Sequence, residues 1–177
     1  LSAMDLAVKL ANDGYAREVD LPAARDWPRW ANWRDTAFAI AVEPAVMVYH
    51  RPAFPDGPPR SRAALIGWLE TAPRASLGTY DIDRSAVGFL LFARDQEHFF
   101  DIWDLALAMG RAGARLFPTS QDVIDRVASG ELLLGYNVLG SYAADQAAIR
   151  PDLGLILPAD FVVLVSRVAL IPRAARN

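Results

Sequence analysis

The stretch 119–143, TSQDVIDRVASGELLLGYNVLGSYA, limits the possible fold more than any other part of this 177-residue chain. Thr119 can cap a helix, and Asp122 can reach back to the cap, which marks a helix start. Gly130 can supply the left-handed residue that ends this helix. The apolar run 132–134 then predicts a short strand that is covered on both faces, as the strands of parallel sheets are.

A polar and aromatic segment follows this predicted strand. It contains Tyr136, Asn137, Ser141 and Tyr142 and leads into the next predicted helix. In open α/β sheets, ligands bind beyond the carboxyl ends of the strands. The sequence therefore predicts a ligand-binding loop at 135–142.

Helices and short strands alternate along the rest of the chain. Capping residues at Ser2, Ser61 and Ser85 indicate further helix starts. The apolar run 38–49 is interrupted by a Glu-Pro pair and predicts two short strands with a kink. This alternation predicts an α/β fold with a largely parallel sheet flanked by helices. Further strands are predicted at 75–79, 116–117, 155–157 and 161–170.

The composition excludes several classes of protein. The net charge is −3, from 18 basic and 21 acidic residues without long runs. The sequence therefore shows no basic run of the kind that binds nucleic acid. The absence of cysteine excludes disulfides and Cys-type metal sites. No apolar run reaches the roughly 20 residues that span a bilayer. We therefore expect a soluble protein.

Catalytic patterns are poorly represented. His50 and His98 are not joined by a metal-binding spacing, and no serine lies in a GxSxG turn. Lys9 is the sole lysine, so a phosphate loop with its lysine is excluded. We expect that the protein is not an enzyme and has no resident cofactor.

Polar residues also gather before the helix that begins at Ser85. Asp81 and Asp83 lie in the preceding turn, and the free backbone donors of a helix start can bind an anion. The alternative is that Asp83 or Ser85 is an ordinary helix cap. Both interpretations stay open at this point.

Three tryptophans lie within seven residues, at positions 27, 30 and 33. Such a cluster can stack a sugar or a base. A loop that packs its aromatic side chains onto its own domain is the more common outcome, and we favour it.

Five segments together carry a resemblance to solute-binding proteins of bacterial ABC importers. The resemblance is greatest to the ferric-iron-type branch, which also includes binders of phosphorylated sugars and a phosphoglycerate transport regulatory protein. It covers nearly the whole chain in the order of the family. The segments are LSAMDLAVKLANDGYA, AIAVEPAVMVYHR, GTYDIDRSAVGFLL, DVIDRVASGELLLGYNVLGSYAADQAA and FVVLVSRVALIPRAARN.

The resemblance implies a periplasmic-binding-protein type II-like lobe, with a remnant of a second lobe and a ligand between the two. Both ends of the chain then look cut from a longer polypeptide. The implied parts are 1–37 as a remnant of the first lobe, 38–50 as the outgoing crossing strand, 51–160 as the second lobe and 161–177 as the return strand.

The resemblance also implies a set of residues that face the ligand. Ferric-ion binders of this family present adjacent tyrosines, whereas Tyr136 and Tyr142 are separated here. We therefore expect a small anionic or phosphorylated solute, with Fe³⁺ bound by Tyr136 and Tyr142 as the alternative ligand. Arg84 is added for its positive charge alone. The expected ligand-binding residues are Ser2, Glu43, Arg84, Ser85, Tyr136, Asn137 and Tyr142.

The implied role is the extracellular or periplasmic component of an ABC importer, with a membrane permease as its partner. A ligand-sensing module that feeds a two-component sensor kinase is the alternative. In the absence of the rest of the first lobe, we expect apolar residues to lie uncovered and the isolated chain to self-associate through them. These residues are Phe38, Ile40, Val168 and Leu170.

Overall fold

The structure is a computed structural model that describes residues 4–176. It divides into two compact units. The first unit consists of Leu1–Glu43 with Leu164–Asn177, and the second unit is Pro44–Val163. Strand β2 (Ala37–His50) belongs to both units because the chain passes through it from the first to the second.

The first unit is built around a helix whose buried residues are alanines. Helix α1 (Met4–Asn12) packs against β7 (Leu164–Leu170), and β7 pairs with β2. The short strand β1 (Asn32–Trp33) pairs antiparallel with the start of β2. Two 3₁₀ turns, η1 (Pro22–Ala24) and η2 (Arg29–Ala31), precede β1. The small core contains Ala7, Ala11, Ala16, Ala37 and Val168.

This packing corrects one expectation about exposed apolar surface. Phe38 and Val168 are each 6% exposed, so the expectation that they lie uncovered is wrong. The alanines of α1 allow the helix to approach closely, and Val168 is buried in the cluster that they form. Ile40 is 59% exposed, as expected.

The tryptophan segment is only partly packed onto its own unit. The indole Nε1 of Trp33 donates a hydrogen bond to Asn12 Oδ1 at 2.9 Å. Trp30, in contrast, is 64% exposed. Trp33 is itself 39% exposed, so the favoured interpretation holds in part for Trp33 and does not hold for Trp30.

The second unit contains a mixed sheet with the strand order β6-β2-β5-β3-β4. Strands β3, β4 and β5 are parallel to one another, as expected. Strand β2 runs antiparallel to both β5 and β6, so the sheet is parallel in one half and antiparallel in the other. These strands are β3 (Leu77–Tyr80), β4 (Arg115–Phe117), β5 (Leu134–Leu139) and β6 (Leu153–Ile156).

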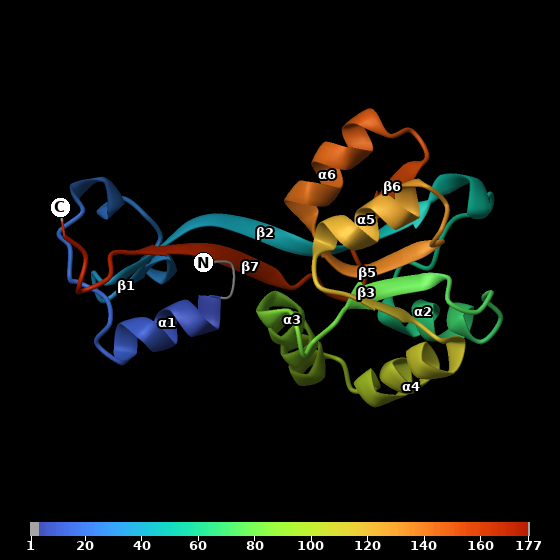
Figure 1. Ribbon diagram of the computed structural model, residues 1–177, viewed down its shortest axis with the longest axis horizontal. Coiled ribbons are helices and arrows are strands. Elements are labelled where there is room, and N and C mark those ends of the chain that lie inside the picture. The colour runs from blue at the N-terminus through green and yellow to red at the C-terminus, as the bar shows by residue number, and fades with distance from the viewer. Residues whose placement is uncertain (1–3, 177) are drawn as a thin grey trace. The chain divides into compact units, whose positions relative to one another are not determined.

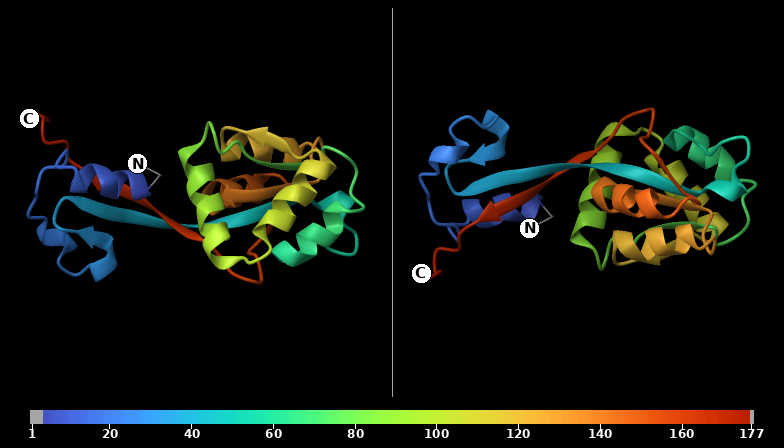
Figure 2. Two further views of the ribbon diagram at one scale, coloured as in Figure 1. Left: turned by 90° about the horizontal axis from the view of Figure 1, so that it is seen from below. Right: turned by 90° about the horizontal axis from the view of Figure 1, so that it is seen from above.

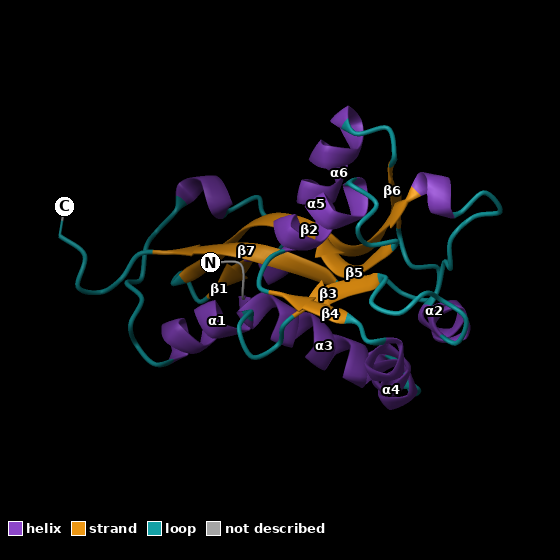
Figure 3. Ribbon diagram, turned by 45° about the vertical axis from the view of Figure 1, so that its right-hand side comes forward, coloured by secondary structure: helices purple, strands orange, loops and turns teal. Residues whose placement is uncertain are grey.

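Helices cover both faces of this sheet (Figures 1 and 3). Helices α5 (Ser120–Ala128) and α6 (Gly140–Ile149) cover one face. Helices α2 (Arg62–Leu69), α3 (Ala86–His98) and α4 (Ile102–Ala112) cover the other, and the short η3 (Arg51–Ala53) follows β2. Figure 2 shows the two helical layers from opposite sides. The α/β fold with a central sheet between helices is confirmed.

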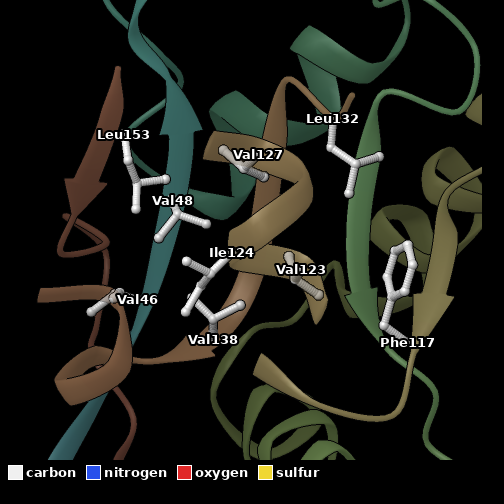
Figure 4. Close-up of a cluster of buried hydrophobic side chains, with 10 residues drawn as sticks. Val46, Val48, Phe117, Val123, Ile124, Val127, Leu132, Val138 and Leu153 are labelled. Carbon is white, nitrogen blue, oxygen red and sulfur yellow. The ribbon is translucent and has the colours of Figure 1, made fainter. Parts of the chain in front are cut away.

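Each face of the sheet has its own hydrophobic core. Figure 4 shows Val123, Ile124 and Val127 of α5 grouped with Val46 and Val48 of β2. Val123, Ile124 and Val127 recur at spacings of one and three residues, and this apolar stripe is the face of α5 that is buried. The core of the opposite face contains Met47, Leu65, Leu69, Leu77, Ile102, Leu105, Leu134, Tyr136 and Ile156.

Three predicted helix starts and one predicted helix end are confirmed. The side chains of Ser61, Ser85 and Thr119 cap α2, α3 and α5, each accepting a hydrogen bond from the backbone N–H three residues later. Gly130 has a φ of +78°, so it takes the left-handed conformation expected after α5. Such caps satisfy donors that a helix start leaves unpaired.

Two predicted strands differ from the structure. Strand β2 is continuous through the Glu-Pro pair, with an irregularity of register between Val46 and Val48, rather than two strands with a kink. Strand β5 begins at Leu134, so the predicted strand at 132–134 was placed too early. The predicted polar loop at 135–142 is in fact most of β5 and the first turn of α6. The prediction was wrong because the polar side chains of this segment form hydrogen bonds with residues that are distant in the sequence.

Close packing beside β5 gives a test of this fold. A Cβ added to Gly135 would lie 2.5 Å from Val123 Cγ1 and 2.7 Å from Val48 Cγ2, whereas nothing lies within 4 Å of a Cβ added to Gly67 in α2. We expect Gly135→Ala to lower the free energy of unfolding by about 1–3 kcal/mol through overpacking. Gly67→Ala should raise it by roughly 0.5–1 kcal/mol, because alanine favours a helix interior over glycine. Urea unfolding of both variants measures the difference, and equal effects would contradict the packing described here.

Candidate functional site

The candidate site is the edge of the second unit's sheet at which its parallel strands end. Strand β3 ends at Tyr80, β4 at Phe117 and β5 at Leu139. Helices α3, α5 and α6 begin shortly after these strands, so three helix N-termini lie toward the same edge. Helix N-termini carry partial positive charge and backbone donors that suit an anion.

The turn before α3 is built by its own carboxylate. Asp81 Oδ1 accepts a hydrogen bond from the backbone N–H of Asp83 at 3.1 Å, and the Asp81 carbonyl accepts one from Ser85 N–H at 2.9 Å. Ser85 Oγ accepts from Gly88 N–H, so it is a helix cap. Arg84 is exposed beside it and supplies a positive charge at this helix start. The capping interpretation of Ser85 is therefore correct, and it is compatible with a ligand nearby.

A serine connects the three elements at this edge. Ser120 Oγ lies 2.5 Å from the Tyr80 hydroxyl and accepts a hydrogen bond from Leu139 N–H at 2.9 Å. Leu139 is the N-cap of α6, and its apolar side chain does not cap the helix. Tyr142 lies in the first turn of α6 and is 41% exposed. Ser120 thus fixes β3, α5 and β5 relative to one another directly beneath the edge.

A fully buried ion pair lies within the same unit. Arg62 and Asp95 are both 0% exposed, and Arg62 Nε and Nη2 donate to Asp95 Oδ1 at 3.0 and 2.7 Å. Arg62 Nη1 also donates to Asp160 Oδ1 and to the Phe161 carbonyl, each at 3.0 Å. The guanidinium carbon lies 3.7 Å from the centre of the Phe161 ring. A buried charge pair is tolerated only when its remaining donors and acceptors are also paired, as they are here.

The second oxygen of Asp95 binds two residues of β5. Asp95 Oδ2 accepts hydrogen bonds from the Tyr136 hydroxyl at 2.7 Å and from Asn137 Nδ2 at 2.5 Å. Tyr136 is 4% exposed and Asn137 is 5% exposed. Asn137 has a φ of +58°, in the left-handed region that asparagine tolerates better than most residues. We refer to Arg62, Asp95, Tyr136, Asn137 and Asp160 as the buried polar network.

The network shifts the ionisation of two of its members. Burial, followed by the charge of Asp95, raises the pKa of the Tyr136 hydroxyl well above its usual range. Burial alone would lower the pKa of Arg62, but the acidic groups Tyr136, Asp95 and Asp160 raise it above its ordinary value. Arg62 therefore stays charged and Tyr136 stays a neutral hydrogen-bond donor at physiological pH.

The structure separates the expected ligand-binding residues into groups. Arg84, Ser85 and Tyr142 lie at the edge, whereas Tyr136 and Asn137 lie inside the second unit on Asp95. Glu43 belongs to the first unit, where it is 5% exposed and accepts a hydrogen bond from Arg167 Nε. Ser2 lies outside the described residues.

Sequence reasoning missed the two central residues of the network, Arg62 and Asp95. Each is a charged residue near the end of a helix, where charged side chains are expected to face water. No local pattern distinguishes them, since Arg62 and Asp95 are 33 residues apart. Only the folded structure, which places the buried guanidinium of Arg62 against the buried carboxylate of Asp95, reveals this pair.

No metal site of the usual kind is seen in the described part of the chain. Residues 4–176 contain no group of three or more His, Cys, Asp or Glu side chains that could hold a metal ion. His98 is exposed at the end of α3. None of the helices within residues 4–176 is both long and apolar enough to cross a membrane.

Comparisons with known proteins identify the fold. Models of protein families and curated protein sequences gave no match. Among solved structures, the chain is similar to the substrate binding protein of the ABC transporter from Agrobacterium tumefaciens, with 52% identity and a TM-score of 0.96. The chain has the α/β fold of a periplasmic-binding-protein lobe. The similarity covers 98% of this chain and 52% of that protein, so the chain spans about half of its length.

More distant structures share this fold. A periplasmic binding protein from Actinobacillus pleuropneumoniae with fructose-6-phosphate bound has 13% identity and a TM-score of 0.80, over 98% of this chain and 57% of that one. A ferric iron-binding protein from Mannheimia haemolytica has 12% identity and a TM-score of 0.71, over 98% of this chain and 58% of that one. At these identities the likeness concerns the fold alone.

The buried ion pair gives a prediction about stability. Replacing Arg62 with Met leaves Asp95 charged and buried without its main partner, which should cost about 3–5 kcal/mol in the free energy of unfolding. Arg94→Met is the matched control, because Arg94 pairs with Glu97 on the exposed surface of α3. An exposed pair of this kind contributes at most about 1 kcal/mol. Urea unfolding measures both variants. A similar loss in the free energy of unfolding for both would show that the buried pair contributes no more than the exposed one.

The raised pKa of Tyr136 predicts a loss of stability at alkaline pH. A group whose pKa is higher in the folded state stabilises the fold fully below its unfolded-state pKa, which is about 10 for tyrosine. That contribution is lost as the pH rises through the folded-state value. The stability difference between the wild type and Tyr136→Phe should therefore be constant below about pH 10 and shrink by about 1.4 kcal/mol per pH unit above it. Urea unfolding from pH 8 to 11 tests this, and a constant difference throughout would refute it.

Proposed function

We propose that this chain is part of the substrate-binding component of an ABC transporter, located in the periplasm or outside the cell. The observation that carries the proposal is the 52% identity with the substrate-binding protein from Agrobacterium tumefaciens over 98% of this chain. Because the chain spans about half of that protein, the activity, solute and partners of the whole protein are part of the proposal. A membrane permease would be the partner, and the complete protein would capture a solute without converting it. A role as a ligand-sensing module for a two-component sensor kinase remains a prediction.

We propose a small anionic or phosphorylated solute as the ligand. Three helix N-termini lie toward the edge where the parallel strands end, and Arg84 adds a positive charge there. Backbone donors at helix starts together with an arginine form the usual combination that binds phosphate.

The edge residues and the buried residues have different parts in this proposal. Arg84, Ser85 and Tyr142 would contact the solute. Tyr136 and Asn137 are buried on Asp95, and we propose that they fix the strand from which α6 begins. Ser2 and Glu43 remain predicted contacts from the resemblance alone.

Ferric ion is the second candidate ligand, since a ferric iron-binding protein shares the fold. Iron would require tyrosine phenolates, because phenolate oxygen suits a hard trivalent ion. The Tyr136 hydroxyl donates to Asp95, and burial raises its pKa well above the usual range, so its phenolate is disfavoured. Tyr142 alone is accessible, and this favours an anion over iron.

The solute class can be tested with the intact protein by calorimetric titration. We expect fructose-6-phosphate or inorganic phosphate to bind, and Arg84→Gln with Ser85→Ala to weaken binding at least tenfold, because hydrogen bonds to charged groups contribute about 1.5–3 kcal/mol each. Ser129→Ala is the matched control, since the Ser129 hydroxyl donates to a carbonyl at the opposite end of a helix, α5.

The same titration distinguishes the alternatives. Binding of ferric citrate with a visible absorption band that Tyr142→Phe abolishes would replace the anion by iron. Chemical conversion of the bound solute would contradict the transport role. Native mass spectrometry of the purified intact protein would identify a solute that is neither phosphate nor iron.

A further inference from the structure

We propose that the first unit contains a separate binding site for a small dianion that carries a planar ring, of which an aromatic phosphate monoester is the simplest example. The site is a groove of about 340 Å³ formed by residues 24–35, a segment that includes η2 and β1 (Figure 1). Its polar and aromatic lining residues are Arg25, Trp27, Arg29, Asn32, Arg34 and Asp35.

The positive charge of the groove indicates an anionic ligand. Three guanidinium groups line it, against the single carboxylate of Asp35. Arg25 lies 3.4 Å from the carboxylate of Asp20, whereas Arg29 and Arg34 form no ion pair within residues 4–176. Guanidinium groups bind phosphate and carboxylate oxygens through pairs of hydrogen bonds. Two guanidinium groups without a counter-charge therefore match a ligand with two negative charges.

Trp27 supplies an aromatic wall beside these charges. It is half-buried and lines the groove, whereas Trp30 and Trp33 do not belong to the lining. The three tryptophans thus differ in role, since Trp33 instead bonds to Asn12 of its own unit. Aromatic side chains favour stacked contacts with other flat rings. A planar ring on the ligand can therefore stack on Trp27 while its charged group contacts the arginines.

The turn between β1 and β2 holds Arg34 beside the groove. Asn32 Oδ1 accepts a hydrogen bond from Asp35 N–H at 3.0 Å, and Asn32 Nδ2 donates to Asp35 Oδ1 at 2.7 Å. The guanidinium carbon of Arg34 lies 5.3 Å from the centre of the Trp33 ring. The turn and the indole therefore restrict the positions that this guanidinium can take before a ligand binds.

The backbone of this turn is unusual for the residues that occupy it. Arg34 and Asp35 both have a φ of +52°. This left-handed region is unfavourable for a residue with a Cβ, and tight hairpin turns usually place Asn or Gly there. An arginine at this position therefore indicates a role for its guanidinium beyond the turn itself.

The groove and the proposed solute site share no residue. Arg84, Ser85 and Tyr142 belong to the second unit, and the lining of the groove belongs entirely to the first. The groove is thus an additional site, and variants of the two sites can be tested separately.

Benzyl phosphate tests the proposal, because it combines a planar ring with a phosphate monoester that carries about two negative charges above its second pKa. In calorimetric titrations of the intact protein at about pH 8, we expect it to bind about tenfold more tightly than two partial mimics. Benzyl alcohol lacks the charge, and methyl phosphate lacks the ring. Excess fructose-6-phosphate should not compete with benzyl phosphate.

Variants locate the binding in the groove. Arg34→Asn removes a guanidinium and suits the left-handed backbone, so it should fold and weaken the binding of benzyl phosphate by about tenfold. Arg173→Asn is the matched control, because Arg173 is exposed in the same unit and does not line the groove. Trp27→Leu should weaken the binding of benzyl phosphate and leave that of methyl phosphate unchanged.

Several outcomes would overturn the proposal. These are an absence of benzyl phosphate binding, equal affinities of the wild type and Arg34→Asn, and displacement of benzyl phosphate by fructose-6-phosphate. The proposed solute site is judged independently, because Arg84→Gln with Ser85→Ala should weaken the binding of fructose-6-phosphate alone. Arg34→Asn should weaken the binding of benzyl phosphate alone.

Discussion

The second unit depends on the complete pairing of one buried carboxylate. Asp95 accepts two hydrogen bonds from Arg62 on one oxygen, and hydrogen bonds from Tyr136 and Asn137 on the other. A charge at this depth is tolerated because its counter-charge and its hydrogen bonds are all present. The interaction joins the start of α2, the last turn of α3 and the centre of β5. Through Arg62 it also reaches Asp160 and Phe161, just before the chain leaves the unit.

This arrangement changes the meaning of the polar residues in β5. Tyr136 and Asn137 look like ligand contacts in the sequence because they follow an apolar run. In the structure, both side chains donate hydrogen bonds to the buried carboxylate of Asp95. The exposed aromatic residue of this segment is instead Tyr142, in the first turn of α6. A helix start that lacks a capping side chain there, together with the capped start of α3, gives an edge suited to negative charge.

The strand ends of the second unit differ in polarity from its interior. The strand ends carry helix termini and an arginine, which suit an anion in contact with water. The cavity bordered by α3 and α4 is lined mainly by apolar side chains. Strand β5 joins the two regions, because it leads into α6 at its end and holds Tyr136 and Asn137 against Asp95 at its centre. The buried polar network makes this strand rigid.

Local patterns in the sequence determined the elements of this fold. Thr119, Ser61 and Ser85 marked helix starts because a hydroxyl beside three unpaired N–H groups has a strong local effect, and Gly130 marked an end because glycine adopts positive φ without strain. The apolar stripe of α5 and the alternation of strands with helices likewise predicted the layered architecture. Tertiary structure alone decided where β5 begins, that β2 is continuous and antiparallel to its neighbours, and which polar residues are buried. The burial of Arg62 and Asp95 could not be predicted, because a charged residue is expected to be exposed. Only the fold brings each of the two against a partner that is distant in the sequence.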